Sequence, residues 1–182
     1  MGKRQDRLEK LIAPFVKTQR RVHKLRRNDF NEAQLKEIAK IYKALGGILE
    51  TPPINYGKYD FVINGVVVEL DEENHFNRYR LKTLKSTIYK QNNIFNVSEY
   101  RKYCETFESN CRAYGNFWSN PSTEKQFGLP CEPGNHSGNG SPRWKQRAFY
   151  DFLKDYLPLV ANIPIVRLSI YNEFNGVTLN KI

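Results

Sequence analysis

Apolar residues recur every three to four positions in two stretches of the chain, which predicts two amphipathic helices. The first runs from Phe30 to Leu45, begins at a cap on Asn28 or Asp29, and ends at Gly46-Gly47. The second runs from Arg143 to about Leu157. Each has an apolar side, so each is expected to pack against other elements of the fold.

Strand-like patterns mark a hairpin between these two helices. Its strands are Tyr59 to Ile63 and Val66 to Asp71, and the Asn64-Gly65 pair between them is the strongest short-range signal for a two-residue turn. A third strand, Ile163 to Ile170, is nearly continuous in apolar residues. We therefore expect that strand to be central in its sheet.

The remaining segments complete an α/β arrangement. We expect helices at Phe76 to Tyr89 and Glu99 to Cys111, and a long loop or insertion over residues 116–141, which are rich in Gly, Pro, Ser and Asn. The chain then divides into a basic N-terminal helical arm, 1–28, and one domain, 29–182. The predicted fold class is α/β, with a central mixed sheet and flanking helices.

The turn at Asn64-Gly65 sets the hairpin register and gathers three acidic side chains on one face. Asp60 lies opposite Glu69, and Asp71 lies two residues further along the same face. Opposed like charges destabilise a sheet, so the three carboxylates need a compensating cation. Mg²⁺ takes hard oxygen ligands, so all three are candidate magnesium ligands. The alternatives are a solvent-exposed hairpin end or neutralisation by arginine and lysine.

The net charge points to an acidic partner. The chain has 29 Lys and Arg residues against 19 Asp and Glu, a net charge of +10. Ten of the basic residues fall between Lys3 and Arg27, where only Asp6 and Glu9 oppose them. This arm fits either an element that lies along nucleic-acid phosphates or a solvated amphipathic helix packed on the domain.

Composition argues against several classes. No stretch approaches the ~18–20 apolar residues of a membrane span, and the polar N-terminus lacks the apolar segment of a secretory signal. Three cysteines argue against a disulfide scaffold and fit the reducing cytoplasm. Cys104, Cys111, Cys131 and His136 lack the tight pair typical of zinc sites, so unrelated thiols are favoured over zinc. No phosphate loop is present, so we expect no nucleotide cofactor.

An acidic residue that opens one strand of a hairpin, with Glu-x-acid in the next strand, resembles the motif of the PD-(D/E)xK nucleases, whose fold is restriction-endonuclease-like. Asp60 and Glu69-Leu70-Asp71 carry the resemblance. It implies a restriction-endonuclease-like core and a metal-dependent endodeoxyribonuclease. It also implies double-stranded DNA as substrate, Mg²⁺ as cofactor and Mn²⁺ as a substitute.

The chain departs from that motif at two positions. Tyr59 precedes Asp60 where the family has proline, and Asp71 stands where it usually has lysine. The stretch from Glu69 to His75 is similar to a variant found in mismatch-nicking endonucleases, in which His75 would act as general base or phosphate contact. The implied catalytic set is Asp60, Glu69, Asp71 and His75.

In size and composition the chain resembles the small catalytic subunit of a heterodimeric type IIS restriction endonuclease, whose large subunit recognises the site and cuts the other strand. A stand-alone mismatch-nicking-type endonuclease and a non-catalytic DNA-binding or assembly subunit are the alternatives. Glu37 could be an outer carboxylate of the site, although a solvated glutamate is the simpler interpretation. Lys145 and Arg147 could face the same groove. The implied DNA-binding residues are Arg20, Arg21, Lys24, Arg26, Arg27, Arg78, Arg80, Lys82 and Lys85.

Overall fold

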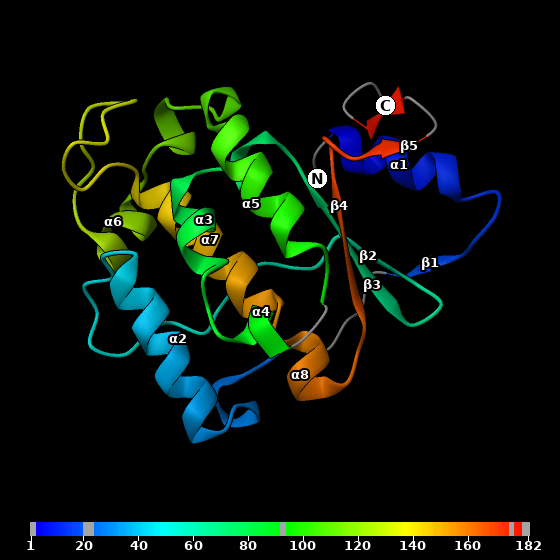
Figure 1. Cartoon of the computed structure of the whole chain (residues 1–182), viewed down its shortest axis with the longest axis horizontal. Coiled ribbons are helices and arrows are strands. Elements are labelled where there is room, and N and C mark those ends of the chain that lie inside the picture. Colours follow the sequence, from blue (N-terminus) through cyan, green and yellow to red (C-terminus); the bar gives the residue numbers. More distant parts are fainter. Residues whose placement is uncertain (1–2, 20–23, 92–93, 175–176, 180–182) are drawn as a thin grey trace.

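A computed structural model of the chain describes residues 3–19, 24–91, 94–174 and 177–179. Four strands form one open, mixed sheet in the order β1-β2-β3-β4 (Figure 1). The first three strands are antiparallel neighbours, and β4 runs parallel to β3. A separate two-stranded ribbon joins β5 and β6. The strands are β1 (Thr18–Gln19), β2 (Phe61–Ile63), β3 (Val66–Asp71), β4 (Ile165–Ser169), β5 (Glu173–Phe174) and β6 (Val177–Thr178).

Helices flank this sheet and gather around α7 (Figure 1). Helix α7 (Pro142–Lys154) contacts α2 (Glu32–Ala44), α3 (Arg78–Thr83) and α6 (Pro121–Phe127). The other helices and 3₁₀ turns are α1 (Lys3–Ile12), η1 (Arg27–Asp29), η2 (Glu73–His75), α4 (Ile88–Gln91), α5 (Val97–Thr106), η3 (Glu108–Asn110), η4 (Gly115–Phe117) and α8 (Leu157–Ala161). The predicted α/β class with a mixed sheet and flanking helices is confirmed. None of the helices in the described residues has the length and apolar character needed to cross a bilayer.

The predicted hairpin is confirmed together with its register. Phe61 pairs with Val68, and Ile63 pairs with Val66. Asn64 and Gly65 both have positive φ, 49° and 82°. A two-residue turn with this backbone matches the twist of the flanking strands, which is why this pair fixes the register.

Two of the predicted helices differ from the structure. The segment from Phe76 to Tyr89 is broken into α3 and the start of α4, because the chain between them is held in a turn by Glu37. The Oε1 atom of Glu37 accepts hydrogen bonds from Ser86 Oγ (2.6 Å) and Thr87 N (3.2 Å). The cap of α2 is Asn31, whose side chain accepts from Gln34 N, so the prediction of Asn28 or Asp29 was wrong.

Two predictions about the C-terminal half also need correction. Residues 116–141 are not only loop, because they contain η4 and α6, and α6 packs on α7. Strand β4 lies at the edge of the four-stranded sheet and not in its centre. Its apolar run was misleading, because Ile165 is buried whereas Val166 is 42% exposed on the other face.

The basic N-terminal segment is partly built into the fold. Strand β1 extends the sheet beside β2, and Leu8 of α1 packs against the core. Arg4 of α1 donates to Glu73 Oε1 at 2.6 Å. Arg4, Leu8, Leu70 and Leu179 line one small pocket, so α1, β3 and the chain after β6 meet there, as the positions of α1 and β5 in Figure 1 indicate. Helix α1 is therefore attached beside β3.

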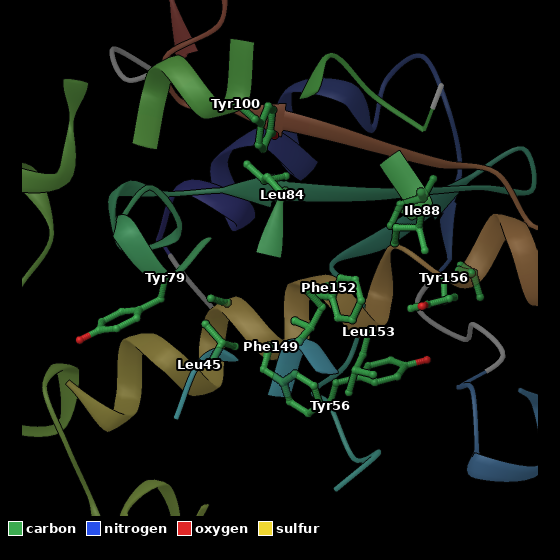
Figure 2. Packing of buried hydrophobic residues seen from close by; sticks show 14 of the residues in the cluster. Leu45, Tyr56, Tyr79, Leu84, Ile88, Tyr100, Phe149, Phe152, Leu153 and Tyr156 are labelled. Carbon is green, nitrogen blue, oxygen red and sulfur yellow. The ribbon is translucent and has the colours of Figure 1, made fainter. Parts of the chain in front are cut away.

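The core lies between α7 and the segments that surround it. Figure 2 shows Phe149, Phe152 and Leu153 of α7 at its centre, between Leu84 and Ile88 on one side and Tyr56 on the other. The three α7 side chains are at most 1% exposed. The inner face of α7 is thus fixed by packing, and polar groups on that face take fixed positions.

The N-terminus of α7 allows a direct test of its cap. Ser141 Oγ accepts from Trp144 N at 3.1 Å and donates to Trp118 O at 2.6 Å, and the residue is fully buried. We expect Ser141→Ala to lower the free energy of unfolding by about 1–2 kcal/mol, because it leaves Trp144 N without its cap acceptor and removes one of the two donors to Trp118 O, which keeps the bond from Arg143 N. Urea denaturation followed by circular dichroism measures this. The matched control is Ser137→Ala at an exposed position, and an equal loss there would contradict the assignment.

Candidate active site

A pocket of about 240 Å³ lies where the hairpin begins and ends. Its walls come from α1, the residue before β2, β3, η2 and the last residue of α7. The lining side chains are Gln5, Asp60, Glu69, Leu70, Glu72, His75 and Lys154. Three of the four predicted catalytic residues, Asp60, Glu69 and His75, therefore face one cavity.

Asp60 and Glu69 are held together by the backbone of the two strands. Asp60 N donates to Glu69 Oε1 at 3.1 Å, and Leu70 N donates to Asp60 Oδ2 at 2.7 Å. The predicted opposition of these two carboxylates is thus present, and each is anchored from the other strand.

Lys154 completes this pair from α7. Its Nζ atom donates to Glu69 Oε2 at 2.5 Å and to Lys58 O at 2.9 Å. Glu69 is 2% exposed and Lys154 is 8% exposed. The ammonium is therefore shared between a strand carboxylate and the chain leading into β2.

The electrostatics of the pocket favour a further cation. Burial raises the pKa of Asp60. Burial also raises the pKa of Glu69 to about 7, even though Lys154 acts in the opposite direction. Two carboxylates share one ammonium here, and half-buried Glu72 adds a third acid to the lining. A divalent cation with oxygen ligands would relieve this excess of negative charge.

Asp71, also predicted as a metal ligand and catalytic residue, does not line this pocket and is not joined to the pair. The residue is 1% exposed, and Arg167 Nη1 lies 2.8 and 2.9 Å from its two carboxylate oxygens. Tyr100 OH donates to Oδ2 at 3.0 Å. Both oxygens are used within the protein, because β4 places Arg167 on the same face, beside β3.

His75 lies between the pocket and this buried acid. Its Nδ1 atom is 2.7 Å from Asp151 Oδ2 and 3.2 Å from Asp71 Oδ1. These three residues bring one ligand atom each within 4.8 Å of one another. We place no metal there, because the Arg167 guanidinium already compensates the acids at 2.8 Å from Asp71 and 3.9 Å from Asp151.

A network of buried ion pairs extends from this point into the core. Asp155 Oδ1 accepts from Arg167 Nε at 2.6 Å, and Asp155 Oδ2 accepts from Arg80 Nη2 at 2.8 Å. Arg80 and Arg167 have side-chain exposures of 1% and 0%. An isolated buried charge strongly destabilises a folded protein, so each of these groups needs its partners in order to remain charged inside the core.

The basic residues predicted to bind DNA are distributed unevenly. Arg80 cannot contact a phosphate in this structure, because it is buried against Asp155. Arg78 is exposed but paired with Glu108 at 2.5 Å. Arg20 and Arg21 lie outside the described residues. The exposed members of the set are Lys24, Arg26, Arg27, Lys82 and Lys85.

Four further candidates are placed away from the pocket. Lys145 is 5% exposed and donates to Asn139 Oδ1, and burial lowers its pKa to about 8. Burial also lowers the pKa of Arg147. Glu37 lines a different pocket and binds Ser86 and Thr87, so it is neither solvated nor part of the site. Cys111 Sγ contacts the backbone oxygens of Glu73 and Phe76.

Sequence reasoning missed Lys154, Asp151 and Arg167. The sequence contains a signal for two of these residues, Asp151 and Arg167. Asp151 and Asp155 follow Ala148 at three- and four-residue steps on the apolar face of α7, where an acid is unexpected. Arg167 interrupts an apolar strand. A charge in either position indicates a buried partner.

The fold and the pocket together define an α/β protein with two strand carboxylates and a helix ammonium in one cavity. Residues 40–182 match the model of a family of unknown function, DUF7255, and because the match covers most of the chain, the chain belongs to this family. No curated protein and no solved structure matches it. The pocket residues from Asp60 to Lys154 fall within the matched region, whereas Gln5 of α1 lies outside it.

Proposed function

We propose that this protein is a metal-dependent endodeoxyribonuclease that hydrolyses a phosphodiester on one strand of double-stranded DNA. The observation that carries the proposal is the convergence of Asp60, Glu69 and Lys154 on one pocket. The resemblance to PD-(D/E)xK nucleases places a lysine two residues after the glutamate. This chain has Asp71 there, and α7 supplies an ammonium to Glu69 instead. In this proposal the core is restriction-endonuclease-like.

The donor set of the pocket fits Mg²⁺, with Mn²⁺ as a substitute. Asp60 and Glu69 offer hard carboxylate oxygens, and Mg²⁺ commonly uses one or two such groups together with substrate phosphate and water. The raised pKa of Glu69, about 7, marks a carboxylate whose charge is incompletely compensated within the protein. These two residues would hold the ion. When bound, it would polarise the phosphate and lower the pKa of its water.

The other residues of the pocket have roles in the same hydrolysis. The Lys154 ammonium, beside Glu69, would stabilise the negative charge that grows on the phosphate oxygens during attack. His75 lines the pocket, and its Nδ1 atom contacts Asp71 and Asp151. It is therefore the group available for proton transfer.

Basic side chains next to the pocket would hold the DNA backbone. Gln5 of α1 lines the pocket and donates to Asp60 O at 3.2 Å, so α1 lies at its rim. Arg7 and Lys10 of the same helix are exposed. Contacts from these residues, and from Lys82 and Lys85, which are exposed but do not line the pocket, would make binding weaken steeply with salt.

The finer proposal is that the protein is the catalytic small subunit of a cytoplasmic type IIS restriction enzyme. A large subunit would recognise the DNA site and cut the other strand. This part rests on the size of the chain and on the sequence resemblance. It predicts that the isolated chain cuts weakly and that the partner increases cutting.

A plasmid-nicking assay tests the proposal. Wild-type protein should convert supercoiled to nicked plasmid with Mg²⁺ and not with EDTA, and a candidate large subunit should raise the rate. Asp60→Asn should abolish cutting and keep DNA binding, whereas Glu32→Gln on exposed α2 should behave as wild type. DNA binding without cutting under any of these conditions would replace this proposal with that of a non-catalytic DNA-binding subunit.

The raised pKa of Glu69 predicts a pH dependence for metal binding. A proton on this carboxylate competes with the ion, and deprotonation increases as the pH rises through about 7. We therefore expect Mg²⁺ to bind about tenfold more tightly at pH 8 than at pH 6 and to release protons on binding. Isothermal titration calorimetry in two buffers of different ionisation enthalpy measures both effects. Glu69→Gln is the control that should remove the dependence, and a flat affinity for wild type would contradict the assignment.

A further inference from the structure

The orientation of the His75 ring distinguishes its two nitrogens, because the protein binds one of them. Nδ1 is directed at two buried acids, 2.7 Å from Asp151 Oδ2 and 3.2 Å from Asp71 Oδ1. The ring lines the pocket. Nε2 has no hydrogen-bond partner among the residues that the structure describes. One nitrogen is thus fixed by the protein, and the other is available to the cavity.

Asp151 is held in place independently of His75. It projects from α7, its side chain is 4% exposed, and its backbone oxygen accepts from Arg167 Nη2 at 3.0 Å. Arg167 Nη2 also lies 3.9 Å from Asp151 Oδ1, so a permanent cation stands beside the carboxylate. Asp151 is therefore a fixed carboxylate acceptor under the imidazole ring.

We propose that His75 and Asp151 form a proton-transfer dyad, in which Asp151 is a positioning residue and His75 Nε2 accepts a proton in the pocket. The Asp151 carboxylate accepts the Nδ1–H hydrogen bond and thereby selects the tautomer whose Nε2 lone pair faces the cavity. This inference rests on the proposed nuclease function and adds its proton acceptor.

In the proposed hydrolysis, every proton and bond is accounted for by water, His75, the phosphate and solvent. A water molecule attacks phosphorus, its oxygen forms the new O–P bond, and Nε2 of His75 takes one of its protons. The P–O bond to the leaving oxygen breaks, and that oxygen takes a proton from solvent. Loss of the orienting carboxylate should leave DNA binding intact and slow this step, because a histidine with the other tautomer cannot accept the proton.

Asp151→Asn is the variant that tests the dyad, and Asp155→Asn is its matched control. Both remove one buried carboxylate near Arg167, but Asp155 makes no contact with His75 among the described residues. The imidazole ¹⁵N shifts of His75 report the tautomer directly. Only three histidines are present, and His75→Gln identifies the signal. Plasmid nicking under single-turnover conditions reports the rate, and DNA binding is measured separately.

We expect the Nδ1–H tautomer in wild type and in Asp155→Asn, and an increased Nε2–H population in Asp151→Asn. The nicking rate of Asp151→Asn should fall by about 100-fold or more with unchanged DNA affinity, and that of Asp155→Asn by no more than about threefold. If wild-type His75 has the Nε2–H tautomer, or if the two Asn variants cut at equal rates, the dyad is rejected and the nuclease proposal stands. Failure of wild type to cut DNA would overturn the nuclease proposal and the role of the dyad together, whatever the tautomer.

Discussion

Arg167→Met is expected to lower the free energy of unfolding by about 4 kcal/mol, because it leaves buried carboxylates without their cation. Arg167 contacts both oxygens of Asp71, and its Nε atom donates to Asp155 at 2.6 Å. Its side chain is completely buried. When one partner is removed from such a cluster, the remaining charges stay buried without compensation, and their desolvation destabilises the folded state. Guanidinium denaturation followed by circular dichroism measures the loss.

The control applies the same substitution to a surface ion pair. Arg78 pairs with Glu108 at 2.5 Å but is 46% exposed, so Arg78→Met should change stability by less than about 1 kcal/mol. If Arg167→Met does not fold, adding Asp71→Asn should partly restore folding, because it removes one of the stranded charges. Equal losses for the two single Met variants would show that the buried network does not stabilise the fold in this way.

Lys154→Met is expected to slow plasmid nicking by about 100-fold to 1,000-fold, the range found when one preorganised donor at a developing anion is lost. The Nζ atom lies 2.5 Å from Glu69 Oε2 inside the pocket. Methionine keeps most of the length of the side chain and removes the ammonium with its two hydrogen bonds. DNA affinity should change little, because Lys154 is 8% exposed, so its replacement leaves the exposed basic surface that would contact the DNA backbone unchanged. Single-turnover nicking rates and a separate binding titration separate these two effects.

Lys145→Met is the control for removing a buried lysine charge from the same helix. Lys145 is 5% exposed, but it binds Asn139 and does not line the pocket. Its nicking rate should stay within about threefold of wild type. Retention of full activity by Lys154→Met would remove this residue from the proposed mechanism, whereas loss in both variants would indicate a folding defect in α7.

The hairpin and its acidic pair could be predicted because their signals are local. Asn64 and Gly65 adopt the positive φ that a two-residue turn requires, and this alone sets Asp60 against Glu69. The apolar face of α7 is similarly local, and its cap, Ser141, is a residue type favoured at a helix start. These features depend on residues fewer than about ten positions apart.

The charged partners of the site could not be predicted in the same way, because they meet across long separations. Glu69 and Lys154 are 85 positions apart, and Asp71 and Arg167 are 96 positions apart. The sequence therefore shows Asp71 as an unpaired acid on the face predicted to bind a metal ion. Only the parallel pairing of β3 with β4 brings Arg167 to it. The edge position of β4 was misjudged for a related reason, because an apolar run does not reveal which face is open to solvent.

The attachment of Asp151 and Lys154 to one helix, α7, has a consequence for how the pocket would respond to a substrate. These groups are fixed by the same core packing that holds Phe149 and Phe152. Their side-chain entropy is therefore lost when the chain folds, and none would be left to lose on binding of the proposed DNA substrate. The floor of the cavity should keep one arrangement in the free and the bound protein. Under the proposed function, adjustment to a curved or distorted duplex would then come from the rim, where Arg4 and Gln5 of α1 bind Glu73 and Asp60 at the ends of the hairpin.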